Sequence, residues 1–297
     1  MIDVKEIINE LKVKLGPAVS EDVLKAEVVR EVIYKESDLL AVGTKLVAVR
    51  KFGALDVKWA YPGEMNAEYP VPEGATAEIA EPIEWTEFNL TLKKAVVRFA
   101  ITDEAKLRQL GNYQLQFSRR RASEALAKKK DEEILTALSN GAGNTVAADA
   151  TWDSDTADPA GDIIEAISKI FQNSNILEAE IQKIAVVVPA KVWAPLHKLQ
   201  EINNLKQSIK DYLEGSYGLK FYPSRLLDTY AMVLVPGEMT AIHGVLDTRK
   251  IPLVEEIRRP EMGATEYVIK QYFATKVVPD TSDGKSYRIC KITGVSS

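Results

Sequence analysis

Residues 88–104 decide the fold, and they read FNLTLKKAVVRFAITDE. Apolar side chains fall on even-numbered positions up to Leu92 and on odd-numbered positions from Ala95 to Ile101. Because successive side chains of a strand point to opposite faces, this switch indicates a bulge or a change of packing partner. We expect the chain to cross here from an extended ribbon into a compact domain.

Before this strand, residues 55–61 alternate strictly between apolar and polar side chains, which predicts a strand with one covered face. Proline and glycine then interrupt regular structure at residues 61–63 and 69–74. The pattern predicts a long two-stranded excursion with an acidic, proline-rich tip. An isolated two-stranded ribbon is marginal in water, so a partner subunit is expected to cover it. The candidate intersubunit contacts are Leu55, Val57, Lys58, Trp59 and Tyr61.

After the strand, Thr102 with two following acids predicts the start of a long helix that ends at residues 140–141. Such a helix is about 55 Å long, more than a small core needs, and Gly111 bends or splits it. It resembles a spine more than a core helix. Its expected apolar stripe is Leu107, Leu110, Phe117, Leu126, Ile134, Leu135 and Leu138.

Two basic clusters lie on this helix. One interpretation is a positive face toward packaged nucleic acid. The other is ion pairing with a neighbouring subunit or along the helix, since Glu124 and Asp131 are close in sequence. Three consecutive arginines cover most of a helix circumference, so they cannot all face one ligand. The candidate genome-facing or interface residues are Arg119, Arg120, Arg121, Lys128, Lys129 and Lys130.

The C-terminal half predicts a second domain of helices packed on a sheet. Residues 141–155 are small and polar and are expected to form a loop. Asp158-Pro159 opens an amphipathic helix, apolar runs at 184–189 and 231–236 predict buried strands, and residues 205–215 predict another helix. Residues 267–278 are strand-like and are expected to pair with residues 88–101, which makes the first domain discontinuous.

The N-terminal residues 4–40 are mostly compatible with helix. Ile7, Ile8, Leu11 and Leu15 recur at helical spacing, and Ser20-Glu21-Asp22 predicts the start of a second, charged helix. Both a packed domain and an arm that lies on a neighbouring subunit fit this pattern.

The composition of the chain argues against several classes of protein. The formal net charge of −5 argues against a protein whose main function is to bind nucleic acid, because such proteins are usually basic. Cys290 is the one cysteine, so no intrachain disulfide or cysteine zinc site is expected. The N-terminus lacks the pattern of a secretory signal, and no apolar run approaches the length that spans a bilayer, so we expect no membrane partner.

Catalytic chemistry is sparse. His197, His243 and Cys290 are the candidates for a base, ligand or nucleophile, and a hydrolase or transferase that uses them is one hypothesis. Packing or surface roles account for them better, because no metal-ligand spacing, Walker loop or nucleophile elbow is present. We expect no catalytic residue, no metal and no cofactor.

The order of these parts resembles the major capsid proteins of tailed phages and related archaeal viruses, which have the Hong Kong 97-type fold. The resemblance rests on residues 88–92 and 99–104 and on residues 122–138 of the long helix. It rests further on residues 186–189 before 193–196, on Leu219-Lys220-Phe221-Tyr222-Pro223-Ser224 and on residues 231–237. It covers about residues 46–278 as a profile of element order.

The resemblance implies an α+β chain in four parts. These are an N-terminal arm (1–45), an extended β-loop (46–86), a peripheral domain with a spine helix (87–158, completed by 266–297) and an axial α/β domain (159–265). Some relatives cross-link subunits through lysine and asparagine. Lys58 lies in the loop, but no asparagine or catalytic acid matches, so that activity is not carried over.

The function implied is a major capsid protein that self-assembles as pentamers and hexamers into an icosahedral shell around a double-stranded DNA viral genome. Portal, scaffold or decoration proteins and weakly bound packaged DNA are the further partners implied. The location implied is the virion, with assembly in the host cytoplasm. The alternative is an encapsulin-like nanocompartment around cargo enzymes, for which the predicted helix at residues 4–15 would hold the cargo peptide.

Overall fold

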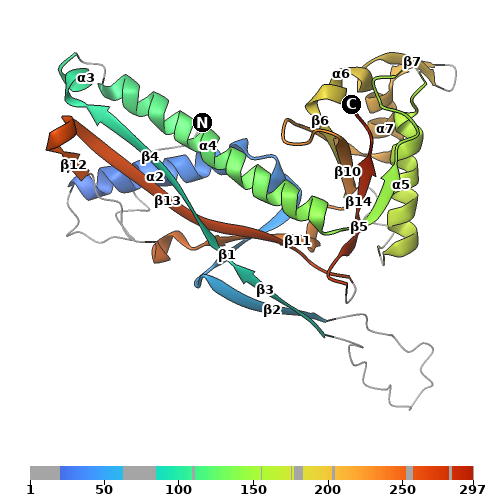
Figure 1. The fold of residues 1–297 in the computed structure, drawn as a ribbon, viewed down its shortest axis with the longest axis horizontal. Coiled ribbons are helices and arrows are strands. Elements are labelled where there is room, and N and C mark those ends of the chain that lie inside the picture. The colour runs from blue at the N-terminus through green and yellow to red at the C-terminus, as the bar shows by residue number, and fades with distance from the viewer. Residues whose placement is uncertain are drawn as a thin grey trace, which may run out of the picture. The chain divides into compact units, whose positions relative to one another are not determined.

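A computed structural model describes residues 21–62, 85–108, 111–154, 156–174, 176, 183–202, 205–251, 257–280 and 283–296. The chain divides into two compact units, each assembled from three separate stretches (Figure 1). Unit 1 combines Met1–Leu55, Leu92–Ala137 and His243–Thr275. Unit 2 combines Asp56–Thr91, Leu138–Ile242 and Lys276–Ser297.

A five-stranded sheet forms the body of unit 1. Its strands run in the order β1-β11-β13-β12, and β4 also pairs with β13. The bounds are β1 Val47–Phe52, β4 Lys93–Thr102, β11 Gly237–Leu246, β12 Ile257–Arg259 and β13 Ala264–Val277. β4 and β13 are antiparallel, from Ala264 opposite Thr102 to Phe273 opposite Lys93. This pairing confirms that the C-terminal part of the chain returns to the strand that follows the ribbon.

Unit 1 also contains the helices α2 (Glu21–Leu40), α3 (Asp103–Leu107) and all but the last three residues of α4 (Gly111–Asn140). The long helix expected from Thr102 is therefore divided, and Gly111 begins the second piece. The 30 residues of α4 correspond to about 45 Å. Polar contacts join α2 to α4, and the Tyr34 hydroxyl on α2 donates to the Lys270 carbonyl on β13.

The ribbon consists of β2 (Asp56–Pro62) and β3 (Trp85–Thr91), which pair antiparallel from Asp56 opposite Thr91 to Pro62 opposite Trp85. The base of the expected two-stranded excursion is confirmed, whereas its tip at 63–84 lies outside the described residues. Leu90 and Leu92 are buried, and in β4 the more buried positions are odd-numbered, ending at buried Ile101. The change of parity is real, and it falls at the break between β3 and β4.

Unit 2 is built on a second five-stranded sheet in the order β5-β14-β10-β6-β9. Its strands are β5 Ala142–Ala147, β6 Ala185–Pro189, β9 Lys220–Ser224, β10 Tyr230–Leu234 and β14 Ser286–Thr293. All five residues of β6 are buried, as expected for a central strand covered on both faces. The two buried strands predicted from the apolar runs are confirmed.

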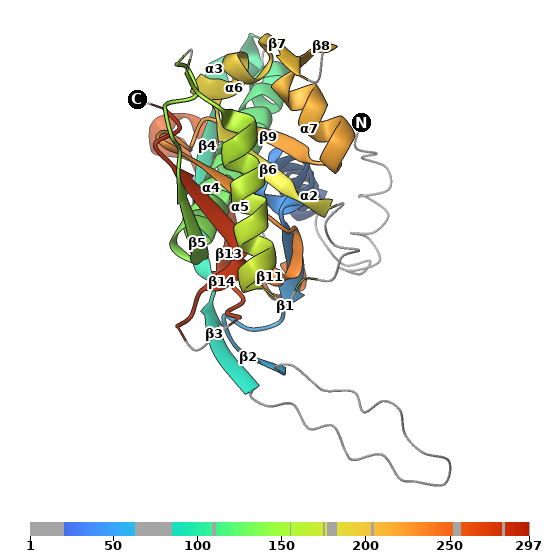
Figure 2. The same ribbon diagram turned by 90° about the vertical axis from the view of Figure 1, so that its right-hand side faces the viewer.

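Helices α5 (Pro159–Asn173) and α7 (Ile209–Tyr217) pack in this unit (Figure 2). The Asp158 side chain caps α5 by accepting from the Gly161 amide at 3.0 Å. The Ser208 hydroxyl caps α7, and Gly218 ends α7 with a positive φ of 67°. The core between helices and sheet includes Ile163, Ile170, Val186, Leu213, Val233 and Ile292.

Several details differ from expectation. Residues 142–147 form β5 instead of a loop, and Leu205 lies in the short strand β8 (Leu205–Ser208), which pairs with β7 (Leu199–Ile202) before α7 begins. The division into units also differs. Residues 243–265 belong to unit 1 instead of the expected second domain, and β14 belongs to unit 2 because it pairs with β10 and β5.

Candidate subunit-contact surfaces

The ribbon presents part of the first predicted contact set to solvent. Leu55, in the bend before β2, is 44% exposed, Val57 is half-buried and Lys58 is exposed. Register places Val57, Trp59 and Tyr61 on one face of β2. The side chains of Trp59 and Tyr61 lie outside the described residues. Their role in subunit contact remains a prediction.

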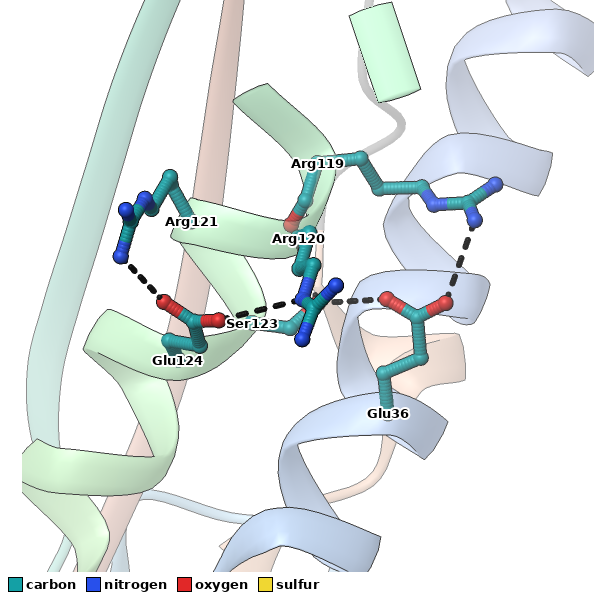
Figure 3. A network of polar contacts seen from close by, with 6 residues as sticks. All are labelled: Glu36, Arg119, Arg120, Arg121, Ser123 and Glu124. Atoms are coloured by element: carbon teal, nitrogen blue, oxygen red, sulfur yellow. Dashed lines mark hydrogen bonds and ion pairs between the residues drawn. The ribbon is translucent and has the colours of Figure 1, made fainter. Parts of the chain in front are cut away.

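The arginines of α4 do not share one environment (Figure 3). Arg119 is half-buried and pairs with Glu36 of α2 at 3.2 Å, and the buried Ser123 hydroxyl donates to the same carboxylate at 2.9 Å. Arg120 and Arg121 are exposed and both bond Glu124, at 3.2 and 2.9 Å. Exposed pairs of this kind contribute little to stability, so these two arginines remain available to a partner.

The three lysines of α4 also differ in exposure. Lys128 is exposed, and Lys129 is exposed and paired with Glu132 at 2.7 Å. Lys130 does not fit the expectation of a genome-facing residue, because its side chain is fully buried and bonds Ser37 and Asp38 of α2. Helical spacing gives the reason, since position 130 is four residues from both Leu126 and Ile134 on the buried stripe.

A buried polar layer therefore holds α2 against α4. Next to Lys130, the Asp131 carboxylate accepts the backbone amides of Gly43 at 2.6 Å and Val42 at 3.2 Å. Burial raises the pKa of Asp131 and lowers the pKa of Lys130, while the opposite charge of Asp38 acts to raise the latter. Burying these charges is costly unless they are paired and hydrogen-bonded, so the layer fixes the relation of the two helices.

An exposed apolar groove is the feature that sequence reasoning missed. Phe117 was expected on the core stripe, but it is 67% exposed, and Leu107 is 84% exposed. Phe117 is nine residues from Leu126, which is half a turn out of phase on a helix. We call the resulting hollow of about 650 Å³ the α2–α4 groove; it is lined by Glu36, Leu39, Leu40, Tyr113, Gln116, Phe117, Arg119 and Arg120.

The candidates for chemistry take packing roles. His197 is exposed after α6 (Trp193–Leu196), with its ring against Trp193. His243 is fully buried on β11 with Nδ1 2.8 Å from the Thr275 hydroxyl, and burial lowers its pKa to about 3. Cys290 is fully buried on β14, and burial raises its pKa to about 12, which suppresses the nucleophilic thiolate.

No cluster of three or more potential metal ligands occurs among the residues that the structure describes. Within the same ranges, no helix combines the length and apolarity needed to cross a bilayer.

Solved structures with a similar fold include proteins from a virus-like particle and from phage capsids. A virus-like particle protein from Pyrococcus furiosus aligns with a TM-score of 0.62 and 10% identity, over 89% of this chain and 97% of that one. The capsid protein of Myoviridae phage XM1 aligns with a TM-score of 0.60 and 15% identity, over 86% and 92%. The capsid protein of a native GTA particle aligns with a TM-score of 0.57 and 13% identity, over 95% of each chain.

These likenesses define the fold as that of the Hong Kong 97-type capsid proteins. The family model described as phage capsid protein matches residues 86–284, which is most of the chain. The chain therefore belongs to this family of phage capsid proteins, the shell-forming structural proteins of the virion. No curated protein matches the sequence.

Proposed function

We propose that this chain is the major capsid protein that assembles with copies of itself, as pentamers and hexamers, into an icosahedral shell around a double-stranded DNA genome. The observation that carries the proposal is the family match across residues 86–284. The ribbon with exposed Leu55 and the open α2–α4 groove support it, because both leave apolar surface for neighbouring copies to cover.

Within this proposal, the ribbon acts as the extended loop that contacts a neighbour through Leu55, Val57, Lys58, Trp59 and Tyr61. The spine-helix region acts as the peripheral domain, and the region around β6, β9 and β10 as the axial domain near capsomer centres. A portal, a scaffold or decoration proteins join the shell during assembly in the host cytoplasm.

Contact with packaged DNA is weak and non-specific in this proposal. Arg120, Arg121 and Lys129 already share carboxylates of the same helix, and the net charge of the chain is −5. Lys128 is exposed on the same helix and adds to this contact. Such binding depends steeply on salt, because each phosphate contact releases condensed counterions.

Electron microscopy of the purified recombinant chain tests the proposal. Closed shells of uniform size are expected, and particles recovered from infected or lysogenic cells are expected to protect double-stranded DNA from nuclease. A chain that stays monomeric under all solution conditions overturns it. Shells that instead enclose a specific enzyme and no genome would favour the nanocompartment alternative, which the phage capsid family match does not favour.

A further inference from the structure

One face of the unit 1 sheet is open and basic. From Lys94 to Ile101, the even-numbered residues of β4 are exposed and the odd-numbered residues are more buried. Register places Lys270 of β13 opposite Val96 on the exposed side. Lys94 and Arg98, two positions away in either direction, are then its diagonal neighbours at about 7–8 Å. Three cations therefore cluster on this face.

The described chain does not neutralise this cluster. The Arg98 guanidinium donates to the Glu266 carboxylate at 2.6 Å, and Arg259 shares the same carboxylate at 3.0 Å. Lys94 and Lys270 are exposed, and neither ammonium group forms an ion pair with another described residue. Like charges at neighbouring positions of a sheet repel each other, so an anionic partner would stabilise this face.

Apolar surface lies among these cations. Val96 is 43% exposed, and Met262 is 66% exposed and lines a hollow of about 340 Å³ together with Arg98 and Arg259. We call this surface the basic sheet face; it consists of Lys94, Val96, Arg98, Lys270 and the hollow at Met262. Its partner should carry carboxylates and apolar side chains but no cations.

The ribbon has this composition. Residues 59–92 contain seven glutamates and no lysine, arginine or histidine. Six of the glutamates lie in the tip, residues 63–84, together with the apolar side chains of Met65, Val71, Ile79 and Ile83. Charge complementarity between surfaces steers their encounter and suppresses wrong pairings. The tip of the ribbon therefore matches the basic sheet face in both charge and apolar content.

Residues 131–168, the other run of more than 30 residues without lysine or arginine, match less well. Several of their acids already bond groups of the same chain; these are Asp131, Glu132, Asp158, Asp162 and Glu165. In the described part of the ribbon, by contrast, Glu87 is exposed and forms no ion pair with another described residue. The carboxylates of the ribbon are the ones left for a partner.

We propose that the tip of the ribbon, residues 63–84, of a second copy of this chain binds the basic sheet face. Its glutamates pair with Lys94, Lys270 and Arg98, and its apolar side chains pack on Val96 and Met262. This inference rests on the proposed self-assembly and adds to it the surface that receives a neighbour's ribbon.

Exchange between copies is the form of this contact that builds a shell. The ribbon and the basic sheet face are two different patches, so they form a heterologous contact, in which each copy gives one ribbon and receives another and a ring closes. The tip is presented for this role, because β2 and β3 pair over seven residues and it begins about 20 Å beyond the Asp56–Thr91 pair. Docking within one chain would use both patches and build nothing, and cross-linking distinguishes the two.

Cysteine cross-linking between two differently substituted full-length chains tests the proposal. Val96→Cys chains are mixed with Val71→Cys or Ile79→Cys chains before assembly and oxidised. Cys290 is fully buried, so it contributes no reactive thiol. In at least one mixture we expect about fivefold more disulfide-linked dimer than either variant forms alone. The matched control replaces Val96→Cys with Phe117→Cys, a 67% exposed position on α4 of the same unit, and should not link.

Charge exchange provides a second measurement. Lys94→Glu/Lys270→Glu in the Val96→Cys chain should lower the dimer yield several-fold at low salt, and Glu78→Lys/Glu81→Lys in the tip chain should restore it. Restoration shows that the first substitutions had not unfolded the chain. The yield from the chains without charge substitutions should also fall as salt is raised, because exposed charges are screened.

Dimer yields equal to the Phe117 control in both mixtures overturn the proposal. So does a link within one chain, found when a Val96→Cys/Ile79→Cys chain is diluted with excess unmodified protein, because it places the chain's own tip on the face. If added double-stranded DNA protects Val96→Cys from thiol labelling while no dimer forms, nucleic acid occupies the basic sheet face and the inference is wrong.

Two further outcomes separate this inference from the shell function. Closed shells without the specific dimer overturn the inference and leave the shell function standing. The specific dimer without shells under any assembly condition supports the inference and overturns the shell function.

Discussion

The buried ammonium group of Lys130 on α4 lies 2.7 Å from the hydroxyl oxygen of Ser37 on α2. Asp38, whose side chain is half exposed, completes the ion pair. The aliphatic part of the Lys130 side chain therefore spans the interface between α2 and α4 without contact with solvent. Its ammonium group is paired with Asp38 at the edge of that interface. This contact joins two segments more than ninety residues apart.

Lys130→Ala should lower the free energy of unfolding by about 2–3 kcal/mol, because it removes a packed stem and leaves the Ser37 hydroxyl without its donor. Lys128→Ala, on the exposed side of the same helix, should change it by less than about 0.5 kcal/mol. Urea unfolding followed by circular dichroism measures both. Equal effects would mean that Lys130 contributes no more than a surface lysine.

His243 should make the fold sensitive to acid. Burial, reinforced by the charge of Lys130, lowers its folded-state pKa from 6.5 to about 3. Between these values the unfolded chain binds a proton that the folded chain excludes, so stability is complete above about pH 6.5 and decreases as the pH falls. Near pH 5 the loss from this residue is about 2 kcal/mol.

His243→Gln removes this titration, so the loss of stability between pH 7 and pH 5 should become smaller by about that amount. The unmodified chain, measured over the same pH range, serves as the reference. Denaturant unfolding at several pH values provides the measurement. If the free energy of unfolding of His243→Gln fell as steeply with decreasing pH as that of the unmodified chain, another group would dominate the sensitivity to acid.

The sequence predicted the parts of the fold that depend on strict periodicity. The parity switch after Leu92 and the return of the chain onto β4 could be inferred because alternation reports which face of a strand is covered. Strand β5 could not be inferred in this way, because its buried positions include the polar residue Asn144. The side-chain amide of Asn144 donates to the Tyr287 carbonyl at 2.7 Å, which satisfies it in the interior. A buried amide in a glycine-containing segment has the composition of a loop.

The candidate surfaces were harder to infer. On charge alone, three consecutive lysines were predicted to form one basic cluster. Only the helical spacing from Leu126 and Ile134 distinguishes the buried Lys130 from its exposed neighbours. The same phase places Arg119 toward α2, seven residues before Leu126, and leaves Arg120 and Arg121 exposed. The α2–α4 groove depends on where a second helix stops, and one helix's pattern does not contain that information.

Gly141→Ala should destabilise unit 2, because a Cβ at this position would lie 2.5 Å from a methyl carbon of Val277. Overpacking of this kind costs about 1–3 kcal/mol. In a Val277→Gly background the added cost of Gly141→Ala should nearly vanish, because the Cβ of Val277, which would lie 2.7 Å from the added Cβ, is removed together with its methyl groups. Gly215→Ala is the matched control. It lies exposed within α7, with no atom within 4 Å of an added Cβ, and should gain about 0.5–1 kcal/mol. Thermal and urea unfolding of the four variants measure the coupling between positions 141 and 277. A cost of Gly141→Ala that persists in the Val277→Gly background would show that this contact is not the reason for glycine at position 141.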